Sequence, residues 1–161
     1  MHKEKSMALR TIRTDDDPIL RKKSRPVENV DDRLFELLDD MKDTLIKAEG
    51  LGLAAVQVGV LRRVVIINMD GKFVELINPE IVKQEGEQKE AEGCLSLPRR
   101  AGVTKRPYSV RIHAFDRFGK KHAYNGTELM ARCFCHEIDH LDGILYSDRL
   151  APGETLYPTE G

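Results

Sequence analysis

The clearest hydrophobic pattern in the first third of the chain is helical and lies near residues 31–47. Apolar side chains recur there every three or four positions, which places them on one face of a helix. These apolar positions are Val30, Leu34, Leu37, Leu38, Met41 and Leu45. Asn29 or Asp31 stands where a helix N-cap belongs, and Gly50 stands where a helix stop belongs. The pattern predicts an amphipathic helix from Asp31 to about Lys47.

A block of strands is predicted from Arg62 to about Asp116. β-branched and alternating runs follow one another there as "RRVVIIN", "FVELINPEIV" and "YSVRIHAF". The segment "MDGK" and the prolines Pro79, Pro98 and Pro107 interrupt these runs. The segment "DRFGK" predicts a hairpin turn that joins "YSVRIHAF" to "KHAYN".

A second helix is predicted from a cap at Thr127 to about Leu141, before a stop at Gly143. At about 100 degrees per residue, this helix carries two stripes. The first stripe spans about 60 degrees and holds Leu129, Cys133, His136 and His140. The second stripe holds Met130, Phe134, Ile138 and Leu141. Two stripes favour a helix that is buried on more than one side, so its histidines face protein or a cavity.

The order of these elements indicates one α+β domain rather than repeated βαβ units. We expect mostly antiparallel strands packed around a central metal-binding C-terminal helix, with the N-terminal amphipathic helix beside them. This single domain is expected to span residues 7–161. Because a second methionine stands at Met7, residues 1–6 are read as a disordered extension or cloning remnant.

Composition narrows the class of protein. Lys and Arg number 26 against 27 Asp and Glu, so the balance predicts neither specific nucleic-acid binding nor an anionic membrane partner. No apolar run approaches the roughly 20 residues that cross a bilayer, and "MHKEKSMALR" lacks the apolar centre of a secretory signal. A soluble, cytoplasmic protein is expected. Three cysteines cannot all pair, which indicates thiol or metal chemistry in a reducing compartment.

The segment "HEIDH" carries the strongest chemical signal. Two histidines four residues apart lie on one helix face and can hold a metal, although they can also be core histidines that bond neighbouring carbonyls. Glu137 lies at the edge of this face. It is either a solvated carboxylate or the base that takes a proton from metal-held water. The remaining arc is solvated or orients the ligands, and it holds Arg132, Asp139 and Asp142.

A third metal ligand has to come from another segment. Cys133 shares the histidine face, but it lies about 10 Å along the axis from His140, so we expect it to line a wall instead. Cys135 points about 100 degrees away from His136 and is read as a packed small residue. Cys94 in "AEGCLSLP" is either an ordinary buried cysteine or the ligand. Two imidazoles and one thiolate would leave a fourth tetrahedral position for water, which is typical of catalytic sites.

The stretch "GLGLAAVQVG" is rich in small residues. Gly50 and Gly52 allow close approach of the backbone to a ligand, or they mark a tight helix exit followed by packing residues. The stretch lacks the lysine of a phosphate-binding loop. Gln57 needs a hydrogen-bond partner if it is buried, and its amide can donate to a developing oxyanion.

With "GLGLAAVQ", "EGCLS" and "HEIDH" intact and in this order, the sequence resembles the peptide deformylase family over nearly its whole length. The resemblance implies that Cys94, His136 and His140 bind one divalent ion. Fe(II) is expected in the cell, and Zn, Ni or Co in purified protein. It implies hydrolysis of the N-formyl-methionyl end of newly made bacterial peptides, with release of formate and a free α-amine.

The resemblance also assigns roles to individual residues. Water activated at the metal attacks the formyl carbon, and Glu137 takes its proton and later delivers it to the leaving nitrogen. The Gln57 side-chain amide and the Leu95 backbone N–H stabilise the oxyanion. The peptide lies extended beside the Gly50–Gly52 loop, and the methionine side chain enters an apolar pocket. The expected substrate-binding residues are Gly50, Leu51, Gly52, Glu92, Leu129 and Cys133, together with the ring of His136.

Two features depart from the family pattern. Cys135 replaces the glutamine that commonly precedes the first histidine, which adds an oxidisable thiol near the site. The chain ends at "LYPTEG" without the long basic C-terminal helix with which some bacterial members dock on the ribosome, so only a transient ribosome contact is expected. Two other readings remain open: a zinc endopeptidase of the H-E-x-x-H type, and a non-catalytic module that a metal closes.

Overall fold

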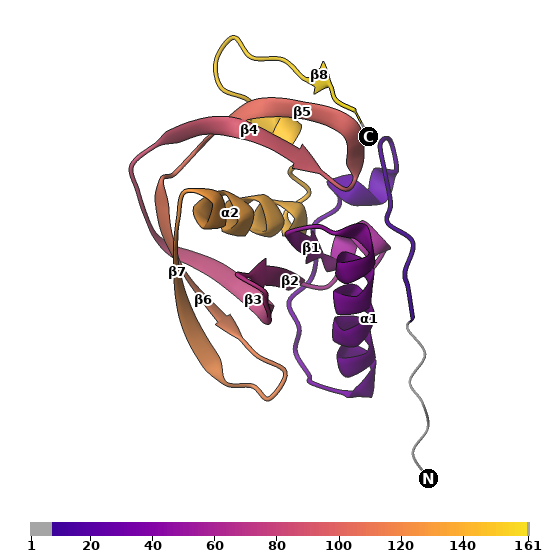
Figure 1. Ribbon diagram of the computed structural model, residues 1–161. Coiled ribbons are helices and arrows are strands. Elements are labelled where there is room, and N and C mark those ends of the chain that lie inside the picture. Colours follow the sequence, from indigo (N-terminus) through magenta and orange to yellow (C-terminus); the bar gives the residue numbers. More distant parts are fainter. Residues whose placement is uncertain (1–7, 161) are drawn as a thin grey trace.

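The computed structural model describes residues 8–160 (Figure 1). The expected disorder of residues 1–6 lies outside the described residues. Helices are labelled α, short 3₁₀ helices η and strands β. In chain order the elements are η1 (Pro18–Arg21), α1 (Asp32–Ala48), β1 (Gly52–Ala54), η2 (Ala55–Val58), β2 (Val64–Met69), β3 (Lys72–Glu85), β4 (Gln88–Cys94), β5 (Leu97–Arg106), β6 (Ser109–Phe115), β7 (Lys121–Thr127), α2 (Leu129–Leu141), η3 (Tyr146–Arg149) and β8 (Tyr157–Pro158).

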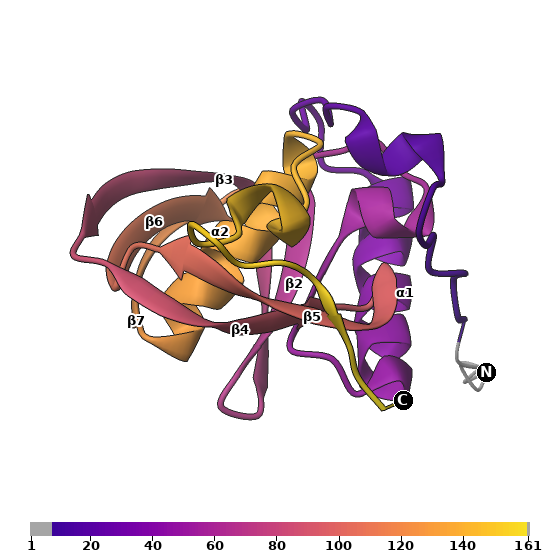
Figure 2. The same ribbon diagram turned by 90° about the horizontal axis from the view of Figure 1, so that it is seen from above.

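The strands form two antiparallel sheets. The larger sheet has the order β1-β2-β3-β6-β7, and the smaller has the order β4-β5-β8. Figure 1 shows α2 between the two sheets, and Figure 2 shows the same arrangement from above. The predicted α+β class, with mostly antiparallel strands packed around the C-terminal helix, is confirmed.

Strand β2 explains why its sequence reads as a continuous apolar run. Because successive side chains of a strand point to opposite faces, Val65 and Ile67 pack toward α2 while Val64 and Ile66 pack toward α1. Both faces of this strand are therefore buried. Helix α2 covers one face of the larger sheet and helix α1 covers the other. Each helix completes a separate hydrophobic cluster on its own face.

Helix α1 lies close to its predicted bounds. The Asp31 carboxylate accepts a hydrogen bond from the Leu34 backbone N–H at 2.9 Å, so Asp31 rather than Asn29 is the cap. Val30 precedes the helix and is exposed, although its spacing placed it on the apolar face. The left-handed residue that ends the helix is Glu49, with φ of 54°, and the Gly50 N–H then donates to the Leu45 carbonyl.

Helix α2 begins differently from the prediction. Thr127 is the last residue of β7 and pairs with Ser109, so it is not the helix cap. The chain turns at Glu128, whose φ is 52°, and the helix starts at Leu129. The predicted stop is confirmed, because Gly143 has φ of 73° and any Cβ there would lie 2.4 Å from the Arg21 carbonyl oxygen.

The "DRFGK" segment forms the predicted turn between β6 and β7. One Asp116 carboxylate oxygen accepts hydrogen bonds from the backbone N–H groups of Phe118 and Lys120, which closes the turn. Across residues 8–160, no helix has the length and apolar character that a membrane crossing requires.

Candidate metal centre

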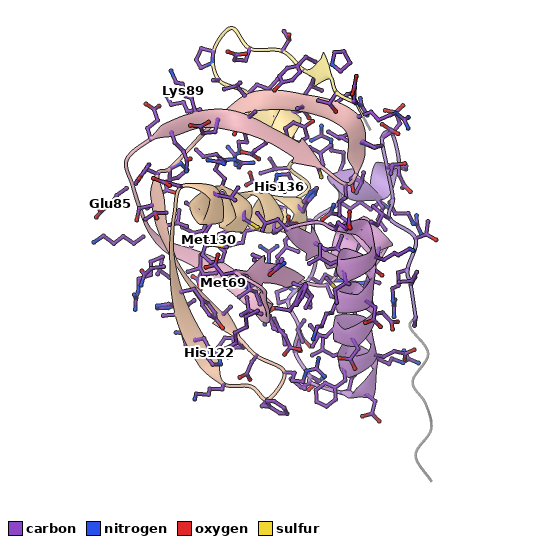
Figure 3. The ribbon with its side chains drawn as sticks, viewed as in Figure 1. Met69, Glu85, Lys89, His122, Met130 and His136 are labelled. Atoms are coloured by element: carbon purple, nitrogen blue, oxygen red, sulfur yellow. The ribbon has the colours of Figure 1, made fainter. Side chains whose placement is uncertain are left out.

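The three predicted donor side chains lie close together. Helix α2 presents both histidines on one face, and their ring centroids are 4.9 Å apart. Cys94, at the end of β4, places its Sγ 3.3 Å from Nε2 of His140. Within the part of the chain that the structure describes, these three residues form the one group of metal-ligand type, and their ligand atoms lie within 4.8 Å of one another. Figure 3 shows His136 on α2 in the space below β4 and β5.

The donor set fits a divalent transition-metal ion. In a tetrahedral site with bonds of about 2.0–2.3 Å, donor atoms lie roughly 3.3–3.7 Å apart, which the separation of Cys94 Sγ from His140 Nε2 matches. Two imidazoles and a thiolate suit Zn, Fe, Co or Ni rather than Mg or Ca. Burial holds the pKa of His140 well below its usual range, which keeps this ring in the neutral form that binds metals.

Glu92 fixes the ring of His136. One carboxylate oxygen of Glu92 lies 2.9 Å from Nδ1 of His136, which leaves Nε2 to face Cys94. Thr104 and Arg106 donate further hydrogen bonds to the same buried carboxylate. Burial acts to raise the pKa of Glu92, but hydrogen bonds from His136 and Arg106 hold it at about 2. Glu92 therefore lines the cavity as an ionised group whose oxygens are already bonded.

Arg106 extends this support toward helix α2. It is buried, and its Nη1 donates to the Asp139 carboxylate at 2.6 Å. Arg149 donates two further hydrogen bonds to Asp139, each at 3.1 Å. The sequence left open whether Asp139 is solvated or orients a ligand. The structure connects it to His136 through Arg106 and Glu92.

Glu137, the second buried glutamate of the site, lacks the hydrogen bonds that Glu92 accepts. It is buried, and its Oε1 has no hydrogen-bond partner within residues 8–160. Burial raises the pKa of Glu137 to about 7. A Cβ on Gly52 would lie 2.8 Å from Oε2 of Glu137 and 3.1 Å from Sγ of Cys133. The absent side chain of Gly52 therefore leaves the space that Glu137 and Cys133 occupy.

The amide of Gln57 has a defined orientation. Its Oε1 accepts a hydrogen bond from the Ala54 N–H at 2.9 Å. Its Nε2 donates to Ser96 Oγ at 3.1 Å and lies 3.7 Å from Cys94 Sγ. Because the oxygen is engaged on the β1 side, the NH₂ group points toward the metal-ligand cluster. This is the direction that a donor to an oxyanion requires.

One cavity of about 460 Å³ opens onto this cluster, a size that suits a small ligand. The predicted site residues at its wall are Gly50, Leu51, Gly52, Gln57, Glu92, Cys94, Leu95, Leu129, Cys133, His136 and Glu137. His140 is not part of the wall; it is buried, and its Nε2 contacts Sγ of Cys94. Wall residues that the sequence reasoning missed are Gly93, Leu97, Pro98, Arg99, Arg100, Thr159 and Glu160. Arg132, which the sequence left as either solvated or ligand-orienting, also lies at the wall. Residues 97–100 directly follow "EGCLS", whereas no local signal marks Thr159 or Glu160.

The other two cysteines lie outside the ligand group. Cys133 is buried at the cavity wall, and burial raises its pKa well above the usual value. Cys135 is also buried, and burial raises its pKa to about 11. Both side chains are therefore protonated thiols near neutral pH.

Comparisons with known proteins agree with this geometry. Residues 9–155 match the family model of polypeptide deformylase. The chain is 54% identical over 144 residues to a peptide deformylase of Alkaliphilus metalliredigens, which covers 89% of this chain and 98% of that protein. It is 56% identical over 144 residues to a peptide deformylase of Acetivibrio thermocellus, covering 89% and 85%. A crystal structure of a peptide deformylase from Legionella pneumophila superposes with a TM-score of 0.87 at 43% identity, covering 90% of this chain and 88% of that one. The chain belongs to the polypeptide deformylase family.

Proposed function

We propose that this chain is a metal-dependent hydrolase that removes the formyl group from the N-terminal formyl-methionine of newly synthesised bacterial proteins and releases formate. The observation that carries the proposal is the meeting of Cys94, His136 and His140 beside the buried Glu137 at one cavity. Membership of the polypeptide deformylase family supports the same reaction. The site of action is the bacterial cytoplasm, where nascent chains emerge and any ribosome contact is transient.

Cys94, His136 and His140 would hold one divalent ion, Fe(II) in the cell and Zn, Ni or Co in purified protein. When bound, such an ion acts as a Lewis acid and lowers the pKa of coordinated water toward neutrality. Because Cys94, His136 and His140 would supply only three donors, the site would have the ligand number of catalytic rather than structural sites.

Glu137 is the proposed proton carrier. It accepts a proton from the attacking water and later delivers it to the nitrogen that leaves the formyl carbon. Its pKa of about 7 suits both steps, because a group that gains and loses a proton works best when its pKa is near the ambient pH. The unbonded Oε1 is available to accept the proton.

Gln57 and Leu95 are proposed to stabilise the oxyanion that forms on the formyl oxygen. The Nε2 of Gln57 is already turned toward Cys94, so it needs no rearrangement to donate. Leu95 follows Cys94 at the cavity wall, which brings its backbone N–H close to the same point. Donors held in place before the reaction stabilise developing charge at little cost in reorganisation.

The substrate is proposed to lie between two strand edges. β1 is an edge strand of the larger sheet and β4 is an edge strand of the smaller one. They reach the cavity through Gly52 and Gly93, respectively. An extended peptide can add to such edges by backbone hydrogen bonds along residues 50–52. The methionine side chain would then contact Leu51, Leu129, Cys133 and the ring of His136. Glu92 contributes to this pocket by holding that ring, because its own oxygens are bonded.

The deciding experiment measures formate release from an N-formyl-Met peptide and from the same peptide without the formyl group. We expect formate from the first and no cleavage of the second. Internal cleavage without formate would instead identify a zinc endopeptidase. Metal analysis of anaerobically prepared protein identifies the ion, and Fe(II) is the expected result.

The Glu137→Gln variant separates catalysis from a merely structural metal. It should retain the metal and lose about 10²- to 10⁴-fold in turnover, which is the usual contribution of a general acid–base group. Unchanged turnover in this variant would contradict the role of Glu137. A protein that binds metal and releases no formate in any form would be the non-catalytic module.

A further inference from the structure

The smaller sheet has an irregular register at the mouth of the cavity. Glu92 pairs with Gly102, whereas Cys94 pairs with Leu97. Gly93 therefore stands alone on β4 opposite residues 98–101 of β5. A bulge of this kind bends a strand and redirects its side chains, and bulges concentrate next to active sites.

Arg99 lies within this bulge in an unusual backbone conformation. Its φ is 61°, in the left-handed region that residues with a Cβ seldom adopt. The segment around β8 holds the backbone in this conformation. The Thr159 N–H donates to the Arg99 carbonyl, and β8 pairs with Arg100 and Ala101. Strained backbone that the surrounding structure maintains is typical of functional sites.

The charged side chains at the rim of the cavity differ in whether they have a partner. Arg99 is exposed at the cavity wall, and its side chain has no ion pair or hydrogen bond within residues 8–160. Arg100, its neighbour, forms an ion pair with Asp15, and Arg132 donates to Gln88 at 2.7 Å. Glu160 lies at the same rim, on the segment that follows β8. Arg99 is thus a cation available to a ligand, and Glu160 lines the same cavity.

The position of Arg99 in the cavity indicates which residues of the substrate it would contact. The proposed methionine pocket includes Leu129, at the beginning of α2. In Figures 1 and 2 this end of α2 lies away from β8 and from the turn that joins β4 to β5. Leu95, Leu97 and Pro98 line the cavity between the metal ligand Cys94 and Arg99 in sequence. An extended substrate whose methionine occupies this pocket and whose following residues run along residues 95–98 would leave the cavity past Arg99.

We propose that Arg99 makes the chain selective for substrates that carry an acidic side chain among the three residues after formyl-methionine, and that Glu160 opposes this selectivity. The inference rests on the proposed deformylase function and specifies its preferred substrates. An exposed ion pair stabilises by a few tenths to about 1 kcal/mol, which corresponds to an expected preference of about 1.5- to 5-fold in kcat/KM.

The test uses amidated peptides of the form formyl-Met-Ala-Ala-Ala, in which Asp or Lys replaces each alanine in turn. Formate release is measured at low ionic strength. We expect kcat/KM to be higher for Asp than for Lys in at least one position, and the difference to shrink in high salt because ions screen exposed charges. Arg99→Gln should abolish the preference, and Glu160→Gln should enlarge it. Arg33→Gln is the matched control, because Arg33 is an exposed arginine on α1 that does not line the cavity.

The unsubstituted alanine peptide reports folding and basal activity in every variant. Equal kcat/KM for Asp and Lys peptides at all positions would overturn the inference, as would a preference that survives Arg99→Gln, and in either case the proposed function would stand. Absence of formate from the alanine peptide in the unaltered protein would instead overturn the proposed function, and the inference with it.

Discussion

Arg106 offers the most direct test of how the proposed metal ligands are held. It is buried, and it donates two hydrogen bonds to Glu92 at 3.0 Å and one to Asp139 at 2.6 Å. Replacing it with methionine keeps a long, flexible side chain and removes the charge. Glu92 then remains as a buried carboxylate without its main partner, and its hold on His136 weakens.

The structure sets the size of the effect and supplies a control. Breaking a buried ion pair by removing one partner costs about 3–5 kcal/mol, because an uncompensated charge stays behind. Arg149 bonds the same Asp139, but its side chain is 45% exposed. Arg149→Met should therefore cost only about 0–1 kcal/mol. The same chemical change beside the same carboxylate is thus expected to differ by about 3 kcal/mol.

Urea unfolding at fixed metal concentration measures both free energies of unfolding, provided that the m-values match. Metal affinity is the second readout. Loss of a residue that orients a histidine ligand typically weakens affinity by about 10- to 100-fold, so Arg106→Met should fall in this range and Arg149→Met should not. Adding Glu92→Gln to Arg106→Met should recover part of the lost stability, because the stranded charge is then gone. Equal costs for the two arginine variants, or unchanged metal affinity in Arg106→Met, would refute this account of the network.

Two further predictions follow from close contacts elsewhere. Gly52→Ala should lower turnover by about 100-fold with metal retained. The new Cβ would lie 2.8 Å from Oε2 of Glu137 and displace the proposed base. Normal formate release by this variant would contradict the prediction, because Glu137 would then move without loss of activity. Asp31→Ala should lower the free energy of unfolding by about 0.5–2 kcal/mol in urea titrations through loss of the α1 cap, while Asn29→Ala should leave it unchanged. Equal effects of these two substitutions would contradict the assignment of the cap.

The helices and the three motif segments were predictable because their signals are local. Periodic apolar positions indicated α1 and α2 within a few residues, and the spacing of His136 and His140 placed both on one face. Errors occurred at helix ends. Glu49 and Glu128 adopt a positive φ there, although neither residue type is a usual signal for it.

The smaller sheet was much harder to recognise from the sequence. Strand β4 reads "QKEAEGC" and buries Glu92 alone, so it lacks the alternating apolar pattern that marks a strand. β8 is two residues long, and only its distant pairing with β5 brings Thr159 and Glu160 to the cavity. Contacts of this kind depend on the register between segments far apart in the chain, which periodicity does not encode.

The clearest consequence of such long-range contacts is the difference between the two buried glutamates of the site. Nothing in "EGCLS" or "HEIDH" distinguishes the carboxylate of Glu92 from that of Glu137. Burial acts to raise the pKa of both, but Glu92 receives hydrogen bonds from His136 and Arg106 and has a pKa of about 2, whereas Glu137 has a pKa of about 7. Glu92 therefore stays ionised near neutral pH, as a group that orients a ligand must. Glu137 is poised to exchange a proton, so the contacts of Arg106 support a different proposed role for each carboxylate.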